Sequence, residues 1–274
     1  MIQERIYLDE KDENVYLDTY VSSNTDNSPR PAMLILPGGG YHGCSKREAE
    51  PIALSFLAKG VNCFVLFYRT GSPEYTYPTQ LTDASRAILH IRQNAEKYEI
   101  DPARVFVTGF SAGGHLAGAL AYMNDAPEVL SALGIQKGEN KPNGAILCYP
   151  VVTALHSRTH VGSFKNLLNM PFEEIPDDLK RYHSLETHID SNSPPTFIWH
   201  TAADRGVPPT GSLRLAEQLI DNGVVTSLRV YPYGGHGLSL SNHITSGGNP
   251  AAETPLPRGW VDEAYEWLSN LKLD

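Results

Sequence analysis

The chain has 274 residues, and 41% of them are apolar, which is enough for a sizeable core in one large domain or two small ones. Its formal net charge is −9, with 22 Lys and Arg against 31 Asp and Glu and no basic run. This balance argues against nucleic acid and anionic membrane surfaces as partners.

The three cysteines favour a reducing compartment. Cys44, Cys63 and Cys148 are odd in number and widely spaced, and the last two lie in apolar runs typical of buried thiols. The first residues lack a basic region followed by an apolar stretch, and nowhere do 18 apolar residues run together. We therefore expect a cytoplasmic protein that acts on a small molecule, and the sequence leaves open whether it forms a homo-oligomer.

Strand and helix periods alternate along the chain. Residues 4–21 have the pattern of an antiparallel strand pair joined by a polar turn. Further strands are predicted at 32–36, 61–68, 105–108, 145–149, 196–200 and 224–231, with helices at 47–59, 81–98, 209–222 and 260–271. This order predicts an α/β fold, with a mostly parallel central sheet and helices on both faces.

The periodicity breaks down at residues 151–195, where prolines separate short mixed pieces. We expect an irregular insertion there that lies over the sheet and the active site. No repeat or linker interrupts the remaining pattern, so residues 1–274 are expected to form a single domain.

A glycine-flanked serine stands at one predicted strand–turn–helix junction, in Gly109-Phe110-Ser111-Ala112-Gly113. Glycines two positions before and after the serine remove the Cβ atoms that would collide in so tight a turn. The pattern is the G-x-S-x-G nucleophile elbow, in the structural context that it requires. We predict that Ser111 is a catalytic nucleophile rather than part of an ordinary structural turn.

A serine nucleophile needs a general base and a carboxylate that orients the base. In an open parallel sheet, such groups are expected in loops that follow the strands. His236 follows the strand predicted at 224–231, and three neighbouring glycines let its loop approach another backbone. Asp204 follows the strand predicted at 196–200. We therefore predict that His236 is the base and that Asp204 orients it.

Other histidines and aspartates fit these two roles less well. His243 follows the same strand as His236 at a greater distance, and His115 lies in the helical turn after the serine, where packing or capping is expected. His200 ends a strand and fits either a pocket floor or an ordinary buried histidine. Asp83, in a predicted helix, and Asp101, in a turn before its strand, are expected to be surface carboxylates.

A glycine run follows the strand predicted at 32–36 and can bring backbone amides close to the serine. We predict that the amides of Gly39, Gly40 and Ala112 form an oxyanion hole. A phosphate cradle is the alternative for such a run, but no G-x-x-x-x-G-K or G-x-G-x-x-G pattern follows it. Tyr41, directly after the glycines, is predicted to contact substrate.

Two weaker signals remain. His156 and His160 are four residues apart, but no H-E-x-x-H glutamate lies between them, so we expect no metal and no cofactor. Arg47, Glu48 and Glu50 open the helix after the glycine run, where acidic residues suit a helix N-terminus in any case. A pocket role for these three residues is left open.

With these motifs in place, the chain resembles the α/β-hydrolase superfamily, and within it small bacterial esterases similar to carbohydrate acetyl esterases and acetylxylan-esterase-like proteins. The match is carried by the serine motif, by the chain order serine, aspartate, histidine, and by the segments at 37–41, 204–208 and 234–237. Pro37 stands where a related lipase-like group has a histidine, and Arg205 stands where a second carboxylate is often found.

The resemblance implies a serine carboxylester hydrolase for short acyl groups, expected to be acetyl groups on sugars or similar small alcohols. The bulky Tyr41, Tyr68 and Trp199 near strand ends are consistent with a confined acyl site. An amide hydrolase, such as a peptidase or an arylformamidase-like enzyme, would use the same residues. A ligand-binding protein without catalysis is the third reading, although such proteins tend to lose one of the three groups.

Overall fold

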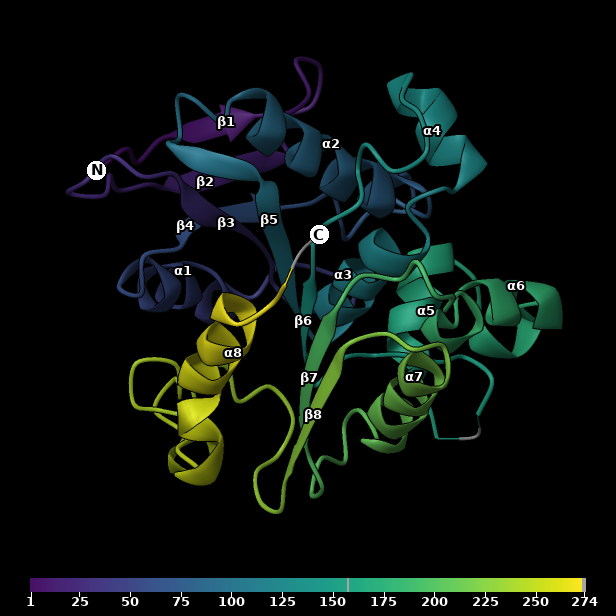
Figure 1. The fold of residues 1–274 in the computed structure, drawn as a ribbon. Coiled ribbons are helices and arrows are strands. Elements are labelled where there is room, and N and C mark those ends of the chain that lie inside the picture. Colours follow the sequence, from purple (N-terminus) through teal and green to yellow (C-terminus); the bar gives the residue numbers. More distant parts are fainter. Residues whose placement is uncertain (157, 273–274) are drawn as a thin grey trace.

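The computed structural model describes residues 1–156 and 158–272 and contains an eight-stranded sheet in the order β1-β2-β4-β3-β5-β6-β7-β8 (Figure 1). The first two strands pair antiparallel, and the remaining strands are parallel to one another. The strands are β1 (Arg5–Tyr7), β2 (Tyr16–Tyr20), β3 (Arg30–Leu36), β4 (Asn62–Phe67), β5 (Ile100–Phe110), β6 (Ala145–Cys148), β7 (Thr196–Thr201) and β8 (Thr226–Tyr231). The predicted edge pair and parallel sheet are therefore confirmed.

Helices cover both faces of the sheet, with α1 and α8 on one side and α2, α3 and α7 on the other (Figure 1). The helices are α1 (Glu50–Leu57), α2 (Thr79–Gln93), α3 (Ala112–Tyr122), α4 (Pro127–Leu133), α5 (Val161–Leu168), α6 (Asp177–Tyr182), α7 (Thr210–Asp221) and α8 (Trp260–Ser269). Short 3-10 turns lie at η1 (Lys46–Glu48), η2 (Phe172–Glu174), η3 (Leu185–Thr187), η4 (Pro250–Ala252) and η5 (Leu256–Gly259).

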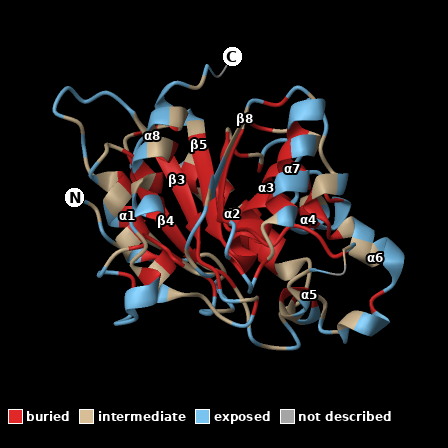
Figure 2. Ribbon diagram, turned by 90° about the horizontal axis from the view of Figure 1, so that it is seen from below, coloured by how far each residue is buried: buried red, intermediate tan, exposed pale blue. Residues whose placement is uncertain are grey.

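The strand β3 shows why its apolar run is continuous rather than alternating. Met33 and Ile35 pack in the core under α1 and α8, whereas Leu34 and Leu36 pack in the core under α2, α3 and α7. Each buried side chain of this size stabilises the fold by about 1.5–3 kcal/mol. Figure 2 shows the resulting pattern, in which buried strands lie between helices whose outer faces are exposed. The sheet is thus fixed from both sides, which gives rigid ends to the strands that carry the site.

Several elements differ from the sequence-based expectation. The helix predicted at 47–59 is divided into η1 and α1, with Pro51 in the first turn of α1. The segment 151–195 is not irregular throughout, because α5 and α6 form within it, and α5 buries Phe164 and Leu167 on one face. The helix α4, which was not expected, ends at Gly134 in the left-handed conformation at φ 65°.

One of the carboxylates expected at the surface is buried. Asp83 lies in α2 and forms an ion pair with Arg69, with 2.6 Å between Oδ1 and the guanidinium nitrogen. Burial raises the pKa of Asp83, and the hydrogen bond from Arg69 opposes that rise. Asp83 therefore belongs to the structural core. Cys63 and Cys148 are buried free thiols, as expected, and Cys44 is half-buried and also free.

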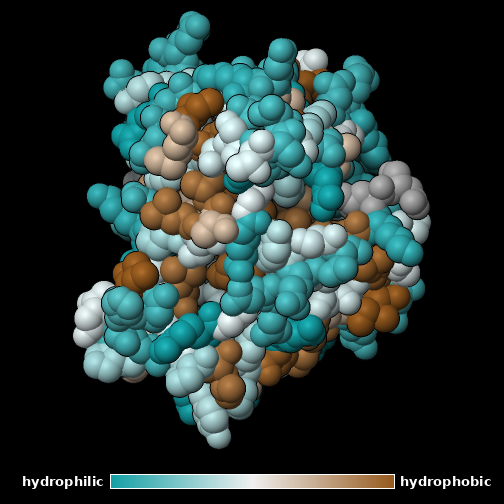
Figure 3. Space-filling view, turned by 60° about the vertical axis from the view of Figure 1, so that its left-hand side comes forward, coloured by the Kyte–Doolittle hydropathy of each residue, from teal (hydrophilic) through white to brown (hydrophobic). Residues whose placement is uncertain are grey.

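A shallow groove lies on the side of the molecule that carries α1 and the edge strands. Figure 3 shows apolar side chains gathered on this face. The groove has a volume of about 790 Å³, and Leu54, Phe67, Leu240 and Ile244 are among its lining residues. Glu50 lines it as well, but none of the residues predicted for the catalytic groups, the oxyanion hole or the substrate contact does. Among the described helices, none is long and apolar enough to cross a membrane.

Candidate active site

The serine turn has the strained geometry that its glycines allow. Ser111 joins β5 to α3 with φ 54° and ψ −117°, a conformation that costs a non-glycine residue of the order of 1–3 kcal/mol. A Cβ atom on Gly109 would lie 2.0 Å from the Gly113 carbonyl oxygen, and one on Gly113 would lie 2.2 Å from the Leu36 carbonyl oxygen. Only glycine fits at either position. The turn is therefore held by close backbone packing, and Ser111 remains 7% exposed.

The imidazole of His236 lies between Ser111 and Asp204. Its Nε2 atom is 2.8 Å from the Ser111 Oγ atom, and its Nδ1 atom is 2.7 Å from the Asp204 Oδ2 atom. A carboxylate only accepts hydrogen bonds, so Nδ1 carries the proton and donates to Asp204. This assignment leaves the Nε2 lone pair free to accept the proton of the serine hydroxyl. The three residues thus form one continuous hydrogen-bond chain.

Asp204 is held by four donors at once. Its Oδ1 atom accepts from the amides of Gly206 and Val207 at 2.8 and 2.9 Å, and its Oδ2 atom accepts from both His236 and His200. Burial alone would raise the pKa of Asp204, but the hydrogen bonds from His200 and His236 outweigh it and hold the pKa well below its usual range. The carboxylate is therefore ionised over the whole physiological pH range.

His200 is a buried partner of the carboxylate. Its Nε2 atom lies 3.0 Å from the Val207 carbonyl oxygen, which only accepts, so Nε2 carries the proton and also points at Asp204 at 3.1 Å. The Nδ1 atom then accepts from the Ser212 hydroxyl at 2.8 Å. Of the two readings that the sequence left open for His200, the structure supports the buried histidine, and it adds a contact with Asp204 that the sequence did not indicate.

The glycine run passes directly over the serine turn. A Cβ atom on Gly38 would lie 3.1 Å from the Ser111 Cβ atom and 2.6 Å from the Phe110 carbonyl oxygen. Gly39 and Gly40 follow with φ values of 140° and 63°, which only glycine adopts without strain. The amide of Gly38 donates to the Glu48 carboxylate at 2.9 Å, whereas Gly39 and Gly40 have no such acceptor among the described residues.

Tyr41 lies with its side chain in the core. Its φ is 60°, its side chain is 2% exposed, and its hydroxyl donates to the His115 Nδ1 atom at 2.8 Å. The Nε2 atom of His115 is bound to the His183 carbonyl oxygen at 2.8 Å, so His115 has a packing role, as expected. The Tyr41 ring therefore presents almost no surface to a substrate, contrary to the contact expected from the sequence. Tyr68 and Trp199 are buried as well.

The segment at 151–195 borders the site. Asn166 in α5 donates to the Gly40 carbonyl oxygen at 2.8 Å, and a Cβ atom on Gly40 would lie 3.9 Å from the His160 Cε1 atom. The His160 imidazole accepts from the Ser163 amide and caps α5, so it is not paired with His156 around a metal. Among the described residues, no group of three or more His, Cys, Asp or Glu side chains is arranged to hold a metal ion.

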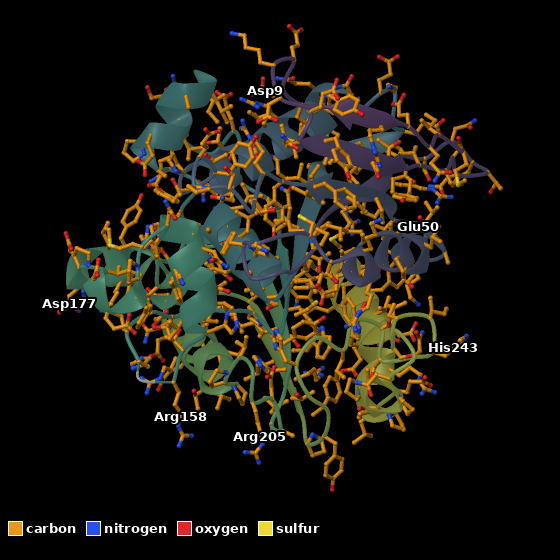
Figure 4. All side chains as sticks on the ribbon, turned by 180° about the vertical axis from the view of Figure 1, so that it is seen from behind. Asp9, Glu50, Arg158, Asp177, Arg205 and His243 are labelled. Atoms are coloured by element: carbon orange, nitrogen blue, oxygen red, sulfur yellow. The ribbon has the colours of Figure 1, made fainter. Side chains whose placement is uncertain are left out.

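A groove of about 670 Å³ opens beside Asp204, between the loop at 202–210 and the segment around Thr159. Arg158 and Arg205 line it, and Figure 4 shows both side chains extending from the same end of the molecule. His243 lies apart from them, on the side of α8, and it is exposed. Among the described residues, His243 has no hydrogen bond to Ser111 or Asp204, in contrast to His236.

A further charged residue at the site is Glu48, for which the sequence left a pocket role open. Glu48 lies in η1 and is buried beneath the glycine run, with its carboxylate bound to Gly38. The only signal in the sequence was an acidic residue near a helix start, which is common at the surface. Its partners come from distant parts of the chain, so the pattern around Glu48 gives no sign of them.

The chain matches one protein-family model and is similar to curated proteins. The protein-family model BD-FAE matches residues 17–219. The chain is 38% identical over 228 residues to endo-1,4-beta-xylanase B of Butyrivibrio fibrisolvens, covering 80% of this chain and 34% of that protein. It is 29% identical over 217 residues to an acetylxylan esterase of Xylanibacter ruminicola, covering 78% and 42%. The chain thus spans less than half the length of these two curated relatives.

Solved structures match over nearly the whole chain. An acetyl ester-xyloside bifunctional hydrolase from Caldicellulosiruptor lactoaceticus superposes with a TM-score of 0.81 at 33% identity, covering 97% of this chain and 95% of that one. The carboxylesterase Cest-2923 from Lactobacillus plantarum gives a TM-score of 0.84 at 27% identity, covering 98% and 97%. The predicted α/β-hydrolase fold is confirmed by these similarities.

Proposed function

The chain belongs to the BD-FAE family, and from this premise we propose that it is a serine carboxylester hydrolase for short acyl esters, with acetylated carbohydrates as its substrate class. Similarity to an acetylxylan esterase and to an acetyl ester-xyloside hydrolase supports this substrate class. The three free cysteines favour a reducing compartment, and we propose the cytoplasm as the place of action.

The observation that carries the proposal is the hydrogen-bond chain from Ser111 through His236 to Asp204, at 2.8 and 2.7 Å. In the proposed mechanism, the Ser111 Oγ atom attacks the ester carbonyl carbon while the His236 Nε2 atom takes the hydroxyl proton. The imidazolium then donates this proton to the leaving alcohol, and an acyl-serine remains. Water then attacks the acyl carbon while the same imidazole takes its proton, and the imidazolium returns this proton to the Ser111 Oγ atom as the carboxylic acid leaves. Asp204 keeps Nδ1 protonated and stabilises the imidazolium.

Backbone amides are proposed to stabilise the negative oxygen of the tetrahedral intermediate. Ala112 is the first residue of α3, so its amide has no acceptor within that helix. The amides of Gly39 and Gly40 are proposed as the other donors, on a loop that packs against the Ser111 turn. Removal of one such donor typically lowers turnover by about 10²–10³-fold.

The enclosure of Ser111 supports a small acyl group. Ser111 is 7% exposed, and Asn166 holds α5 against the backbone of Gly40. Little room is left on this side for a long alkyl chain, which supports acetyl as the acyl group. The groove of about 670 Å³ beside Asp204 is proposed to hold part of the alcohol moiety.

The test compares p-nitrophenyl acetate with p-nitrophenyl octanoate, and measures acetate release from acetylated xylo-oligosaccharides. We expect kcat/KM to be higher for the acetate ester and to be lost in Ser111→Ala. Thr108→Ser, a substitution in the same strand, is the matched control, and it is expected to keep activity. A preference for octanoate contradicts the short-acyl part, and higher kcat/KM for matched anilides or formanilides contradicts the esterase part. Full activity of Ser111→Ala contradicts the mechanism.

A further inference from the structure

The carboxylate of Glu48 is buried beside the site and has no part in the mechanism above. Glu48 is 4% exposed, although glutamate is almost never fully buried unless it is paired. Its Oε2 atom accepts from the Gly38 amide at 2.9 Å, and its Oε1 atom accepts from the Tyr149 hydroxyl at 2.6 Å. The carboxylate is therefore bound on both oxygens by groups from two other segments of the chain.

Tyr149 extends this link to the loop that carries His236. The Tyr149 hydroxyl accepts a hydrogen bond from the Ser239 amide at 2.9 Å, so its one proton is directed to Glu48. The Tyr149 ring also packs edge-to-face on the His236 imidazole, with 5.2 Å between ring centroids and 76° between planes. Tyr149 thus holds both the ring of His236 and the backbone three residues after it.

On its other oxygen, Glu48 binds the first glycine of the run at 38–40. The Gly38 amide belongs to the peptide group that joins Pro37 to Gly38, and its bond to Glu48 fixes the orientation of that peptide plane, one residue before the Gly39 amide. Glycines at φ 140° and 63° follow, and such residues have many other conformations available when nothing holds them. The position of the amides proposed as oxyanion donors therefore depends on an anchor just before them.

We propose that Glu48 is a positioning residue that ties the glycine run at 38–40 and the His236 loop to one buried carboxylate, through Gly38 on one side and Tyr149 on the other. This inference rests on the proposed function, because it concerns the same reaction. Without these two contacts, the oxyanion donors and the His236 imidazole would no longer be held at fixed positions relative to Ser111.

Among the described residues, the Glu48 carboxylate is bound by hydrogen bonds and not by a direct ion pair with a cationic side chain. Burial raises the pKa of Glu48, while the hydrogen bonds from Tyr149 and Gly38 and the nearby positive charge of Arg47 oppose that rise. The Arg47 guanidinium donates to the Gly237 carbonyl oxygen rather than to Glu48, so its contact is with the loop that carries His236. The Ser239 hydroxyl donates to the Arg47 carbonyl oxygen at 2.6 Å and closes this contact.

The test uses Glu48→Ala, Glu48→Gln and Tyr149→Phe, each corrected for the fraction of active enzyme by titration with a fluorophosphonate. In Glu48→Ala the Gly38 amide loses its acceptor, and we expect kcat on p-nitrophenyl acetate to fall by about 10²-fold with little change in KM. Glu48→Gln keeps an acceptor oxygen of the same shape, and we expect it to recover most of this loss. Tyr149→Phe removes both hydrogen bonds of the hydroxyl, the one to Glu48 and the one from Ser239, while the ring can stay against His236, and a loss of about tenfold is expected.

A second readout separates positioning from a merely structural role. Phenylboronic acid forms a tetrahedral adduct on an active serine, so its affinity reports on the oxyanion donors directly. We expect its inhibition constant to rise in Glu48→Ala in proportion to the loss of kcat. Glu50→Ala, at an exposed position two residues away, is the matched control and is expected to leave both quantities unchanged.

The inference is overturned if Glu48→Ala keeps the kcat and boronate affinity of Glu50→Ala. If Glu48→Ala does not fold, the same comparison is made with Tyr149→Phe, and wild-type values there overturn the inference. An active Ser111→Ala enzyme would instead overturn the proposed function, so the two failures are distinguishable.

Discussion

Asp204→Asn is the substitution whose effect follows most directly from the geometry of the site. The carboxylate accepts two amide protons on Oδ1 and two imidazole protons on Oδ2. An asparagine presents one acceptor oxygen and one NH₂ group, so in either orientation its NH₂ group faces two donors. With the oxygen on the amides, His236 relieves the conflict by moving its proton from Nδ1 to Nε2, and that tautomer cannot accept the Ser111 proton.

The loss expected from the wrong tautomer is about 10⁴-fold in kcat, which corresponds to about 5 kcal/mol of transition-state stabilisation. His200 loses its bond to the charged carboxylate but keeps the Val207 carbonyl oxygen as acceptor, which adds a stability cost of about 1.5–3 kcal/mol that circular dichroism and urea denaturation measure separately. Asp101→Asn is the matched control, because Asp101 lies at the opposite end of β5 from Ser111. A folded Asp204→Asn enzyme that keeps more than a tenth of the wild-type kcat would refute this reasoning.

Three further predictions concern the surroundings of the site. Burial lowers the pKa of His115 to about 4, so between about pH 6.5 and 4 the unfolded chain binds this proton and the folded chain does not. As the pH falls through this range, the free energy of unfolding measured by urea titration should fall by about 1.4 kcal/mol per pH unit for this group, and less steeply in His115→Gln. An equal slope in both proteins contradicts this. Gly39→Ala places a methyl group 2.1 Å from a carbonyl oxygen and should lower kcat at least 100-fold. Gly40→Ala leaves 3.9 Å to the nearest neighbouring atom and should keep more than a tenth of the wild-type kcat. Similar kcat values for the two variants would count against the loop geometry. Asn166→Ala removes one hydrogen bond to the backbone of Gly40 and should lower kcat/KM about fivefold, and an unchanged value would show that α5 does not steady the glycine run.

The fold could be predicted well from the sequence because its signals are local. The apolar run of β3 and the glycines around Ser111 each have a single physical explanation, and the structure contains the strand and the turn that they predict. The structure also brings Ser111, His236 and Asp204 within hydrogen-bond distance, while their catalytic roles stay predictions.

The remaining features depend on contacts that no local pattern contains. The helix α5 forms from a short segment because Phe164 and Leu167 are buried by tertiary packing, which stabilises helices too short to form alone. Tyr41 was expected to face substrate, but its positive φ and the acceptor on His115 direct its ring into the core. A pocket role for Glu48 could only be left open, because its partners are supplied by separate loops.

The central claim is that Ser111 is the nucleophile, and covalent labelling tests it most directly. The protein is treated with a fluorophosphonate and analysed by intact-mass and peptide mass spectrometry. We predict one adduct per chain, on the peptide that contains Ser111, and no adduct in Ser111→Ala. Failure of the wild-type protein to react, or equal labelling of Ser111→Ala, would contradict the account.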